Sequence, residues 1–237
     1  MSSFDATIPT VEEIHDMLMD SAMNSSFEVT AEGVQTVIQT KSWRQFFEDV
    51  IKADPWHYSA TKTTPHKESL YDHLIETGKL SYEEAKRLQY DKKDIVKSYL
   101  CGVLHDIGKP GCRMESSVHY SFKGHGLVGG ALIEMYVSDN LLKNFATYGL
   151  TRDDFADISL CSDCHMCGYF ENRGKFDCRF HRACFKILPI STRKTLCTLR
   201  VGDQIGRVPL ISNDNGPFSM TIDEIKGAVM NTQDQFV

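Results

Sequence analysis

The chain has 237 residues, of which 41% are hydrophobic, and a formal net charge of −6 at pH 7. This composition is that of a globular protein and excludes an intrinsically disordered chain. The acidic balance argues against a protein that follows long duplex nucleic acid through many phosphate contacts. No stretch approaches the roughly 18 apolar residues of a transmembrane helix, so no membrane association is expected.

The start of the chain and its cysteines predict a location. The opening residues, MSSFDATIPTVEEIHD, carry acids where a signal peptide would carry cations, and no apolar run follows them. The chain has eight cysteines. Without a secretory signal they favour reduced thiols over a disulfide framework. The sequence therefore predicts a cytoplasmic protein.

Helical signals dominate the first half of the chain. Thr10 and Glu13 form a capping-box pattern in front of VEEIHDMLMDSAM. The segment ESLYDHLIETG also has a helical pattern. Ser81 and Glu84 repeat the capping-box pattern, which predicts the start of a further helix at SYEEAKRLQY.

The second half of the chain shows the same periodicity. IVKSYLCGVLH has apolar residues at positions 95, 96, 99, 100, 103 and 104, a helical stripe that Gly108 and Pro110 are expected to end. Further helices are predicted at residues 126–137, from Thr151 onward, at residues 191–201 and at IDEIKGAVM. A single hairpin is predicted, around Gly174. The predicted fold class is therefore all-α.

Three regions are predicted along the chain: an N-terminal helical extension at residues 1–60, a main domain at 61–210, and a C-terminal linker with a short helix at 211–237. Their charges differ. Residues 1–60 carry ten acids against three Lys or Arg, whereas residues 173–207 carry nine Lys or Arg against two acids. A local positive field would attract a phosphorylated ligand. The alternative is a solvated basic face.

The adjacent residues His105 and Asp106 are the main candidates for a functional site. They stand at the end of an apolar segment, where polar side chains are costly to bury unless something pairs with them. A divalent metal would pair with both, and metal-bound water is a usable nucleophile near neutral pH. A mixture of imidazole and carboxylate suits Fe, Mn, Co, Ni or Zn better than Ca. A buried ion pair within the core is the alternative.

Other segments extend this pattern in a fixed order. SLYDHL contains His73, LHDIGKP contains the pair, FKGHGLVGGA contains His125, DISLCSDCH contains His165, and LRVGDQIG contains Asp203. Together they resemble the HD-domain superfamily of metal-dependent phosphohydrolases, and most closely the HD domain of bacterial tRNA nucleotidyltransferases (CCA-adding enzymes). The resemblance covers about residues 65–208. It implies a helical bundle with a metal site between its helices.

The resemblance also implies the metal ligands. His73, His105, Asp106 and Asp203 would hold one ion. His125 and His165 complete a set of six, which permits two ions bridged by Asp106. The predicted cofactor is therefore one or two divalent transition-metal ions (Mn, Fe, Ni, Co or Zn). His66, two helical turns before His73, is a rival for the first position.

The cysteines around His165 offer a second explanation for that histidine. Cys164-x2-Cys167 is followed by Cys178-x2-His181, a spacing similar to that of a zinc knuckle. A structural zinc at these residues is one hypothesis. The other, which we favour, is that the cysteines are small buried residues or free thiols.

Several cations are candidates for binding phosphate. Lys109 directly follows the residues DIG of the signature, and Asp106 and Lys109 form the predicted catalytic set. Lysine offers a point charge, and arginine a two-pronged donor. The predicted substrate-binding residues are Lys109, Arg113, Arg179, Arg182 and Arg207. The alternative for Lys109 is a cation at the C-terminus of a helix.

The leading functional hypothesis is a phosphohydrolase or phosphodiesterase that uses metal-activated water. The resemblance implies as partner a phosphorylated small molecule, a nucleotide or an RNA end, and not a long duplex. Some HD-superfamily members are mixed-valent di-iron oxygenases, and this is the second hypothesis. A regulatory module with a retained metal is the third. The presence of all six candidate ligands argues against it.

Overall fold

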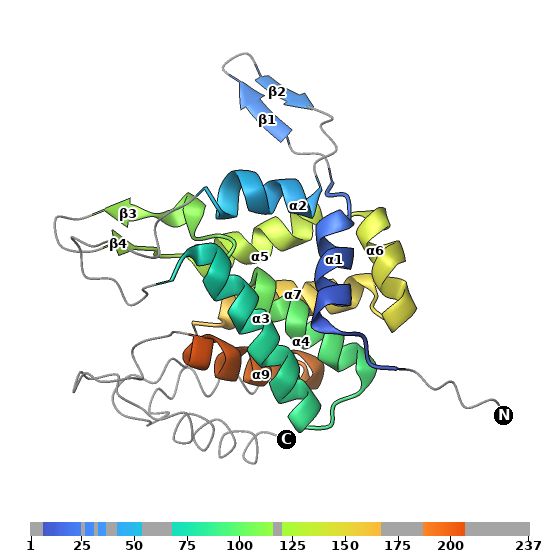
Figure 1. Cartoon of the computed structure of the whole chain (residues 1–237). Helices are drawn as coiled ribbons and strands as arrows, with labels where there is room; N and C mark the ends of the chain where they lie inside the picture. Colours follow the sequence, from blue (N-terminus) through green and yellow to red (C-terminus); the bar gives the residue numbers. More distant parts are fainter. Residues whose placement is uncertain are drawn as a thin grey trace, which may run out of the picture.

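The computed structural model describes residues 7–24, 27–30, 33–36, 42–53, 68–115, 120–166 and 187–206. Helices make up most of these residues and surround one hydrophobic core, so the predicted all-α class is confirmed (Figure 1). Within these ranges the strands form two short antiparallel hairpins. No helix in the described ranges is both long enough and apolar enough to cross a membrane.

Three helices form the centre of the fold: α3 (Leu70–Arg87), α4 (Lys92–Leu104) and α9 (Ile190–Gly206). Helix α3 packs against both others. A Cβ atom at Gly102 of α4 would lie 2.6 Å from the Gly78 Cα atom of α3, and one at Gly202 of α9 would lie 2.7 Å from the Thr77 oxygen. Glycine is needed at these crossings because the backbones touch. The close approach brings the candidate ligands of the three helices together.

Helix α3 is one continuous helix. It begins at Ser69, whose hydroxyl accepts a hydrogen bond from the Asp72 N–H at 3.0 Å. The prediction that a separate helix starts at Ser81 is wrong, because Ser81 lies buried inside α3. Glu84 does not complete a capping box. Its carboxylate accepts two hydrogen bonds from Arg87, at 2.6 and 2.7 Å.

Helix α4 runs through the core and delivers the central residues of the site. It is buried from Asp94 to Leu104, and His105 is its C-cap residue. The helix therefore ends at the His-Asp pair, as its apolar stripe predicts. A 3-10 turn, η2 (Pro110–Cys112), and the hairpin of β3 (Met114–Glu115) and β4 (Tyr120–Ser121) lead on to the next helix.

The next layer consists of α5 (His125–Tyr136), α6 (Asp139–Phe145), the 3-10 turn η3 (Ala146–Tyr148) and α7 (Arg152–Cys164). Helix α5 packs directly against α7. It begins after Gly124, whose φ of +82° is in the left-handed region that favours glycine. The capping box predicted at Thr151 is present at the start of α7, with Asp154 as its partner.

The N-terminal part consists of α1 (Val11–Asp20), the hairpin of β1 (Phe27–Thr30) and β2 (Gly33–Thr36), α2 (Trp43–Phe46) and a π-helical turn, η1 (Phe47–Ile51). The capping box predicted at Thr10 and Glu13 is present.

Helix α1 packs against α2, α4 and α6, and its buried Ile14 and Leu18 belong to the same core as Trp43. The boundary predicted at residue 60, the hairpin around Gly174 and the region 211–237 lie outside the described residues.

Candidate metal centre

All six predicted ligands are buried and meet where five elements converge. His73 belongs to α3, His105 and Asp106 end α4, and His125 is the first residue of α5. His165 follows α7 directly, and Asp203 belongs to α9. The structure thus brings together residues that are far apart in the chain. The other five residues lie around the carboxylate of Asp106.

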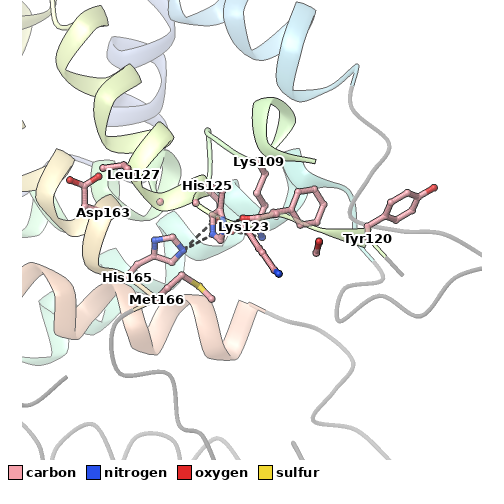
Figure 2. A pocket seen from close by; sticks show the side chains of 13 residues that line it. Lys109, Tyr120, Lys123, His125, Leu127, Asp163, His165 and Met166 are labelled. Carbon is pink, nitrogen blue, oxygen red and sulfur yellow. Dashed lines mark hydrogen bonds and ion pairs between the residues drawn. The ribbon is translucent and has the colours of Figure 1, made fainter. Parts of the chain in front are cut away.

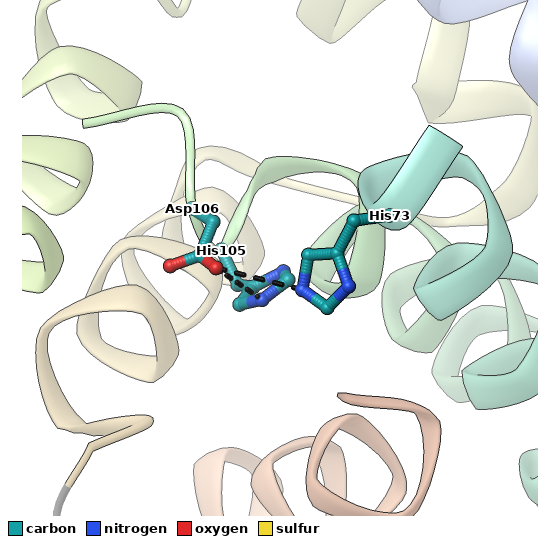
Figure 3. A group of neighbouring side chains, drawn as sticks. All are labelled: His73, His105 and Asp106. Carbon is teal, nitrogen blue, oxygen red and sulfur yellow. Dashed lines mark ion pairs between the residues drawn. The ribbon is translucent and has the colours of Figure 1, made fainter. Parts of the chain in front are cut away.

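The two oxygens of Asp106 face two different pairs of histidines. Its Oδ2 atom lies 3.5 Å from His73 Nε2 and 3.1 Å from His105 Nε2 (Figure 3). Its Oδ1 atom lies 2.9 Å from His125 Nε2 and 3.2 Å from His165 Nε2. Each pair forms with Asp106 a group of three that could hold a metal ion. A carboxylate placed in this way could face one ion with each of its oxygens.

Asp203 adds a carboxylate to one of the two groups. Its Oδ1 atom lies 3.3 Å from His73 Nε2 and 3.8 Å from His105 Nε2. We call His73, His105, Asp106 and Asp203 the inner group, and Asp106, His125 and His165 the outer group. Asp106 belongs to both.

Backbone carbonyls orient three of the four histidines. Each of these rings has its Nδ1 atom next to the carbonyl oxygen of the residue three positions earlier. The distances are 2.8 Å for His105 and 2.5 Å for His125 and His165. A carbonyl oxygen only accepts hydrogen bonds, so Nδ1 carries a hydrogen, and in the neutral ring Nε2 presents a lone pair. This is the tautomer of a metal ligand.

The donor atoms of the centre fit a bound cation. His125 Nε2 and His165 Nε2 lie 3.0 Å apart. With hydrogen on both Nδ1 atoms, two neutral rings would point lone pairs at each other, which is unfavourable unless a cation accepts both. His105 Nε2 and Asp106 Oδ1 are also buried, and their near neighbours are other donor atoms of the centre, at 3.1 Å for His105 Nε2 to Asp106 Oδ2 and 2.9 Å for Asp106 Oδ1 to His125 Nε2. Such atoms are costly to bury unsatisfied, and a divalent metal would satisfy them.

Glu68 orients the fourth histidine, and the sequence did not single it out. Its Oε1 atom lies 3.4 Å from His73 Nδ1. Burial lowers the pKa of His73, but the carboxylates of Asp106, Asp203 and Glu68 outweigh burial and raise this pKa to about 9. A carboxylate behind a ligand histidine increases its basicity. A glutamate ahead of a helix has no pattern that distinguishes it from a surface residue.

Lys109 lies against the bridging carboxylate. Its Nζ atom is 2.5 Å from Asp106 Oδ2, and its side chain is buried. Burial alone would raise the pKa of Asp106, but His105 and Lys109 hold it well below its usual range. Asp106 is therefore ionised. Lys109 balances part of the negative charge of the centre.

A cavity of about 560 Å³ opens beside the outer group (Figure 2). All three residues of the outer group line it, as does Lys109. The other described lining residues are residues 120–124, 126 and 127 and, at the end of α7, Asp163 and Met166. His73, His105 and Asp203 are not among them. A cavity of this size suits a small molecule.

The wall of the cavity combines a cation with apolar side chains. Lys123 is exposed in this wall, next to Phe122 and close in sequence to Tyr120. Leu127 and Met166 are 68% and 45% exposed, unusually high values for large apolar side chains. Lys123 is not among the residues predicted to bind substrate. Lys123 could have been predicted from its position two residues before His125, a candidate ligand.

Of the other predicted phosphate contacts, Arg113 alone is among the described residues. Arg113 follows η2, is half-buried, and is not among the described residues that line the cavity. Arg179, Arg182 and Arg207 lie outside the described residues.

The rival ligands are also largely outside the described part of the chain. His66, Cys167, Cys178 and His181 fall there, so the zinc hypothesis stays a prediction. Cys164 is described and is half-buried at the end of α7.

Comparison with known proteins agrees with this chemistry. Residues 70–144 match the family model of the HD domain. The match supports the HD-domain superfamily of metal-dependent phosphohydrolases, and it includes His73, His105, Asp106 and His125. His165 and Asp203 lie beyond it and are tied to the site by geometry. No curated protein and no solved structure matches the chain, so the likeness to CCA-adding enzymes stays a prediction.

Proposed function

We propose that the protein is a metal-dependent phosphohydrolase that cleaves a phosphomonoester or phosphodiester of a nucleotide or of an RNA end. One observation carries the proposal: the oxygens of Asp106 face two separate histidine pairs, and one pair borders an open cavity. Divalent transition metals bound there would activate a water molecule and stabilise the charge that develops on the phosphoryl group. The donor set suits Mn, Fe, Co, Ni or Zn.

The inner and outer groups would have different roles in this reaction. Apart from the shared Asp106, no member of the inner group lines the cavity, so the role of this group would be to hold a metal firmly. The outer group lines the cavity and meets the substrate. Lys109 keeps Asp106 ionised, and its charge lies at the cavity wall. Lys123 offers a second cation to phosphate oxygens from the same wall.

The apolar part of the wall supports an organic substrate. Phe122, Leu127 and Met166 offer contacts to a base or another flat ring attached to the phosphate. A cavity of about 560 Å³ has room for a mononucleotide or a chain end, and not for a duplex. The preference for short phosphoesters follows from this size.

The test is a panel of phosphoesters with purified protein and each candidate metal. Hydrolysis, followed as phosphate from a monoester or as the monoester product from a diester, should depend on metal, and Asp106→Asn should abolish it because the charge shared by the two groups is lost. Asp139→Asn is the matched control, since Asp139 is an exposed aspartate on α6 with its side chain 99% accessible. Release that is equally fast in Asp106→Asn and wild type would show that the site is assigned wrongly.

The same geometry favours one second candidate. A carboxylate between two histidine pairs also fits a pair of irons, so a mixed-valent di-iron oxygenase is the alternative. Oxygen consumption that requires iron would favour it. Phosphate release with Mn²⁺ or Ni²⁺ in the absence of oxygen would favour the phosphohydrolase.

A further inference from the structure

The outer group is assembled from three elements that one buried serine connects. Asp106 comes from the end of α4, His125 from the start of α5, and His165 from the end of α7. Ser162 lies in the last turn of α7 and is fully buried. It contacts all three elements.

Ser162 makes these contacts through both its hydroxyl and its carbonyl. The Oγ atom donates to the His105 carbonyl oxygen at 2.8 Å and also lies 3.3 Å from the Gly126 oxygen. The Ser162 carbonyl oxygen accepts from His165 Nδ1 at 2.5 Å. Because His105 precedes Asp106 and Gly126 follows His125, each contact is made to a ligand or to the neighbour of one.

The packing around Ser162 leaves no room for adjustment. A Cβ atom at Gly129 would lie 2.7 Å from Ser162 Oγ, and one at Gly126 would lie 2.7 Å from the Ser162 oxygen. The backbone of α5 therefore rests directly on this serine. A shift of Ser162 would move the ligands of α5 and α7 relative to Asp106.

We propose that Ser162 is a positioning residue that sets the geometry of the outer group. The geometry of the inner group depends on other contacts. The inference rests on the metal centre proposed above. The inner group draws its ligands from α3, α4 and α9, which meet through their own glycine crossings. Losing the Ser162 hydroxyl should therefore weaken one ion and spare the other.

The experiment is a titration with Mn²⁺, followed by electron paramagnetic resonance, of the full-length wild type and Ser162→Ala. The wild type should bind two ions. Ser162→Ala should keep the first and bind the second about 10–100-fold more weakly, the usual loss when a contact behind a ligand is removed. This readout does not depend on activity.

Ser159→Ala is the matched control. Ser159 lies one turn earlier on the same helix and is also buried. Its hydroxyl donates to the Gly130 oxygen at 3.0 Å and lies 3.2 Å from Glu134 Oε1, so it also joins α7 to α5, but away from every ligand. It should destabilise the fold to a similar degree in thermal unfolding and still bind both ions.

The outcomes separate the inference from the proposed function. A wild type that binds no Mn²⁺, Co²⁺ or Zn²⁺ would overturn the metal centre and the inference with it. Two ions in wild type, with equal losses in Ser162→Ala and Ser159→Ala, would overturn only the role of Ser162.

Equal weakening of both ions in Ser162→Ala would also overturn the role of Ser162. If Ser162→Ala does not fold, Ser162→Cys replaces it, because a thiol is somewhat larger than the hydroxyl but keeps a donor, although a weaker one. It should show a smaller loss with the same asymmetry, and Ser159→Cys is its control.

Discussion

The Nε2 atoms of His125 and His165 lie 3.0 Å apart, although the two rings come from different helices and both hold their hydrogen on Nδ1. This geometry is unfavourable for two neutral imidazoles, because the lone pairs on their Nε2 atoms repel each other. A cation between the rings and Asp106 Oδ1 removes the conflict. The outer group therefore fits a second metal ion beside the one that the inner group could hold.

The first prediction concerns the number of metal ions. Purified wild type loaded with Mn²⁺ or Zn²⁺ should contain about two ions per chain, since two groups of ligands share Asp106. His165→Ala should lower this toward one, because only the outer group loses a ligand. Elemental analysis of desalted protein measures both values. A single ion per chain in wild type would contradict a second metal position.

The second prediction concerns stability without metal. The centre buries two carboxylates and four imidazoles, and a bound metal stabilises only the folded state. Removing the metal with a chelator should lower the melting temperature by several degrees, since about 1 kcal/mol corresponds to roughly 2–4 °C for a chain of this size. Readdition of metal should restore it. Differential scanning calorimetry makes the measurement, and an unchanged melting temperature would contradict metal binding in this core.

The sequence was sufficient where a feature is local. The apolar stripe before His105 predicted both α4 and its end, and the capping boxes at Thr10 and Thr151 predicted the starts of α1 and α7. The same pattern failed at Ser81, because packing of Gly78 against α4 keeps α3 helical through that point. Tertiary contacts of this kind decide whether a helix continues, even where the local sequence has a capping pattern.

In the candidate site, too, some residues could be predicted from local sequence and others depend on packing. The six candidate ligands could be singled out because their segments resemble, in order, those of a known family, and their binding of metal stays a prediction. Glu68 and Ser162 could not, because their roles exist only after α3, α5 and α7 have packed. A serine inside a helix and a glutamate before one are ordinary in any sequence. The hairpin of β1 and β2 was also missed, since strands of four residues give little periodicity.

The third prediction concerns Lys123. Its cation lies in the cavity wall and touches no member of the outer group in any described contact. Lys123→Ala should raise KM for a phosphoester about tenfold or more, since a hydrogen bond to a charged group contributes about 1.5–3 kcal/mol. Metal content should not change.

Lys143→Ala is the control for this variant, because Lys143 is exposed on α6 and does not line the cavity. Steady-state kinetics and elemental analysis together give the answer. Equal KM values for Lys123→Ala and Lys143→Ala would remove Lys123 from substrate binding.

The last prediction concerns the crossing of α3 and α4, which sets the distance between His73 and Asp106. A Cβ atom at Gly102 would lie 2.6 Å from the Gly78 Cα atom and 2.8 Å from the Thr77 oxygen, both of them backbone atoms that cannot rotate away. Gly102→Ala should therefore push the two helices apart and destabilise the fold by about 1–3 kcal/mol. It should also weaken the inner ion, because His73 moves away from Asp106. Gly111→Ala is the control, since its nearest neighbour would be Val128 Cγ1 at 4.0 Å. Chemical denaturation and Mn²⁺ titration measure the two effects, and a Gly102→Ala protein as stable as Gly111→Ala would show that the crossing is looser than the structure has it.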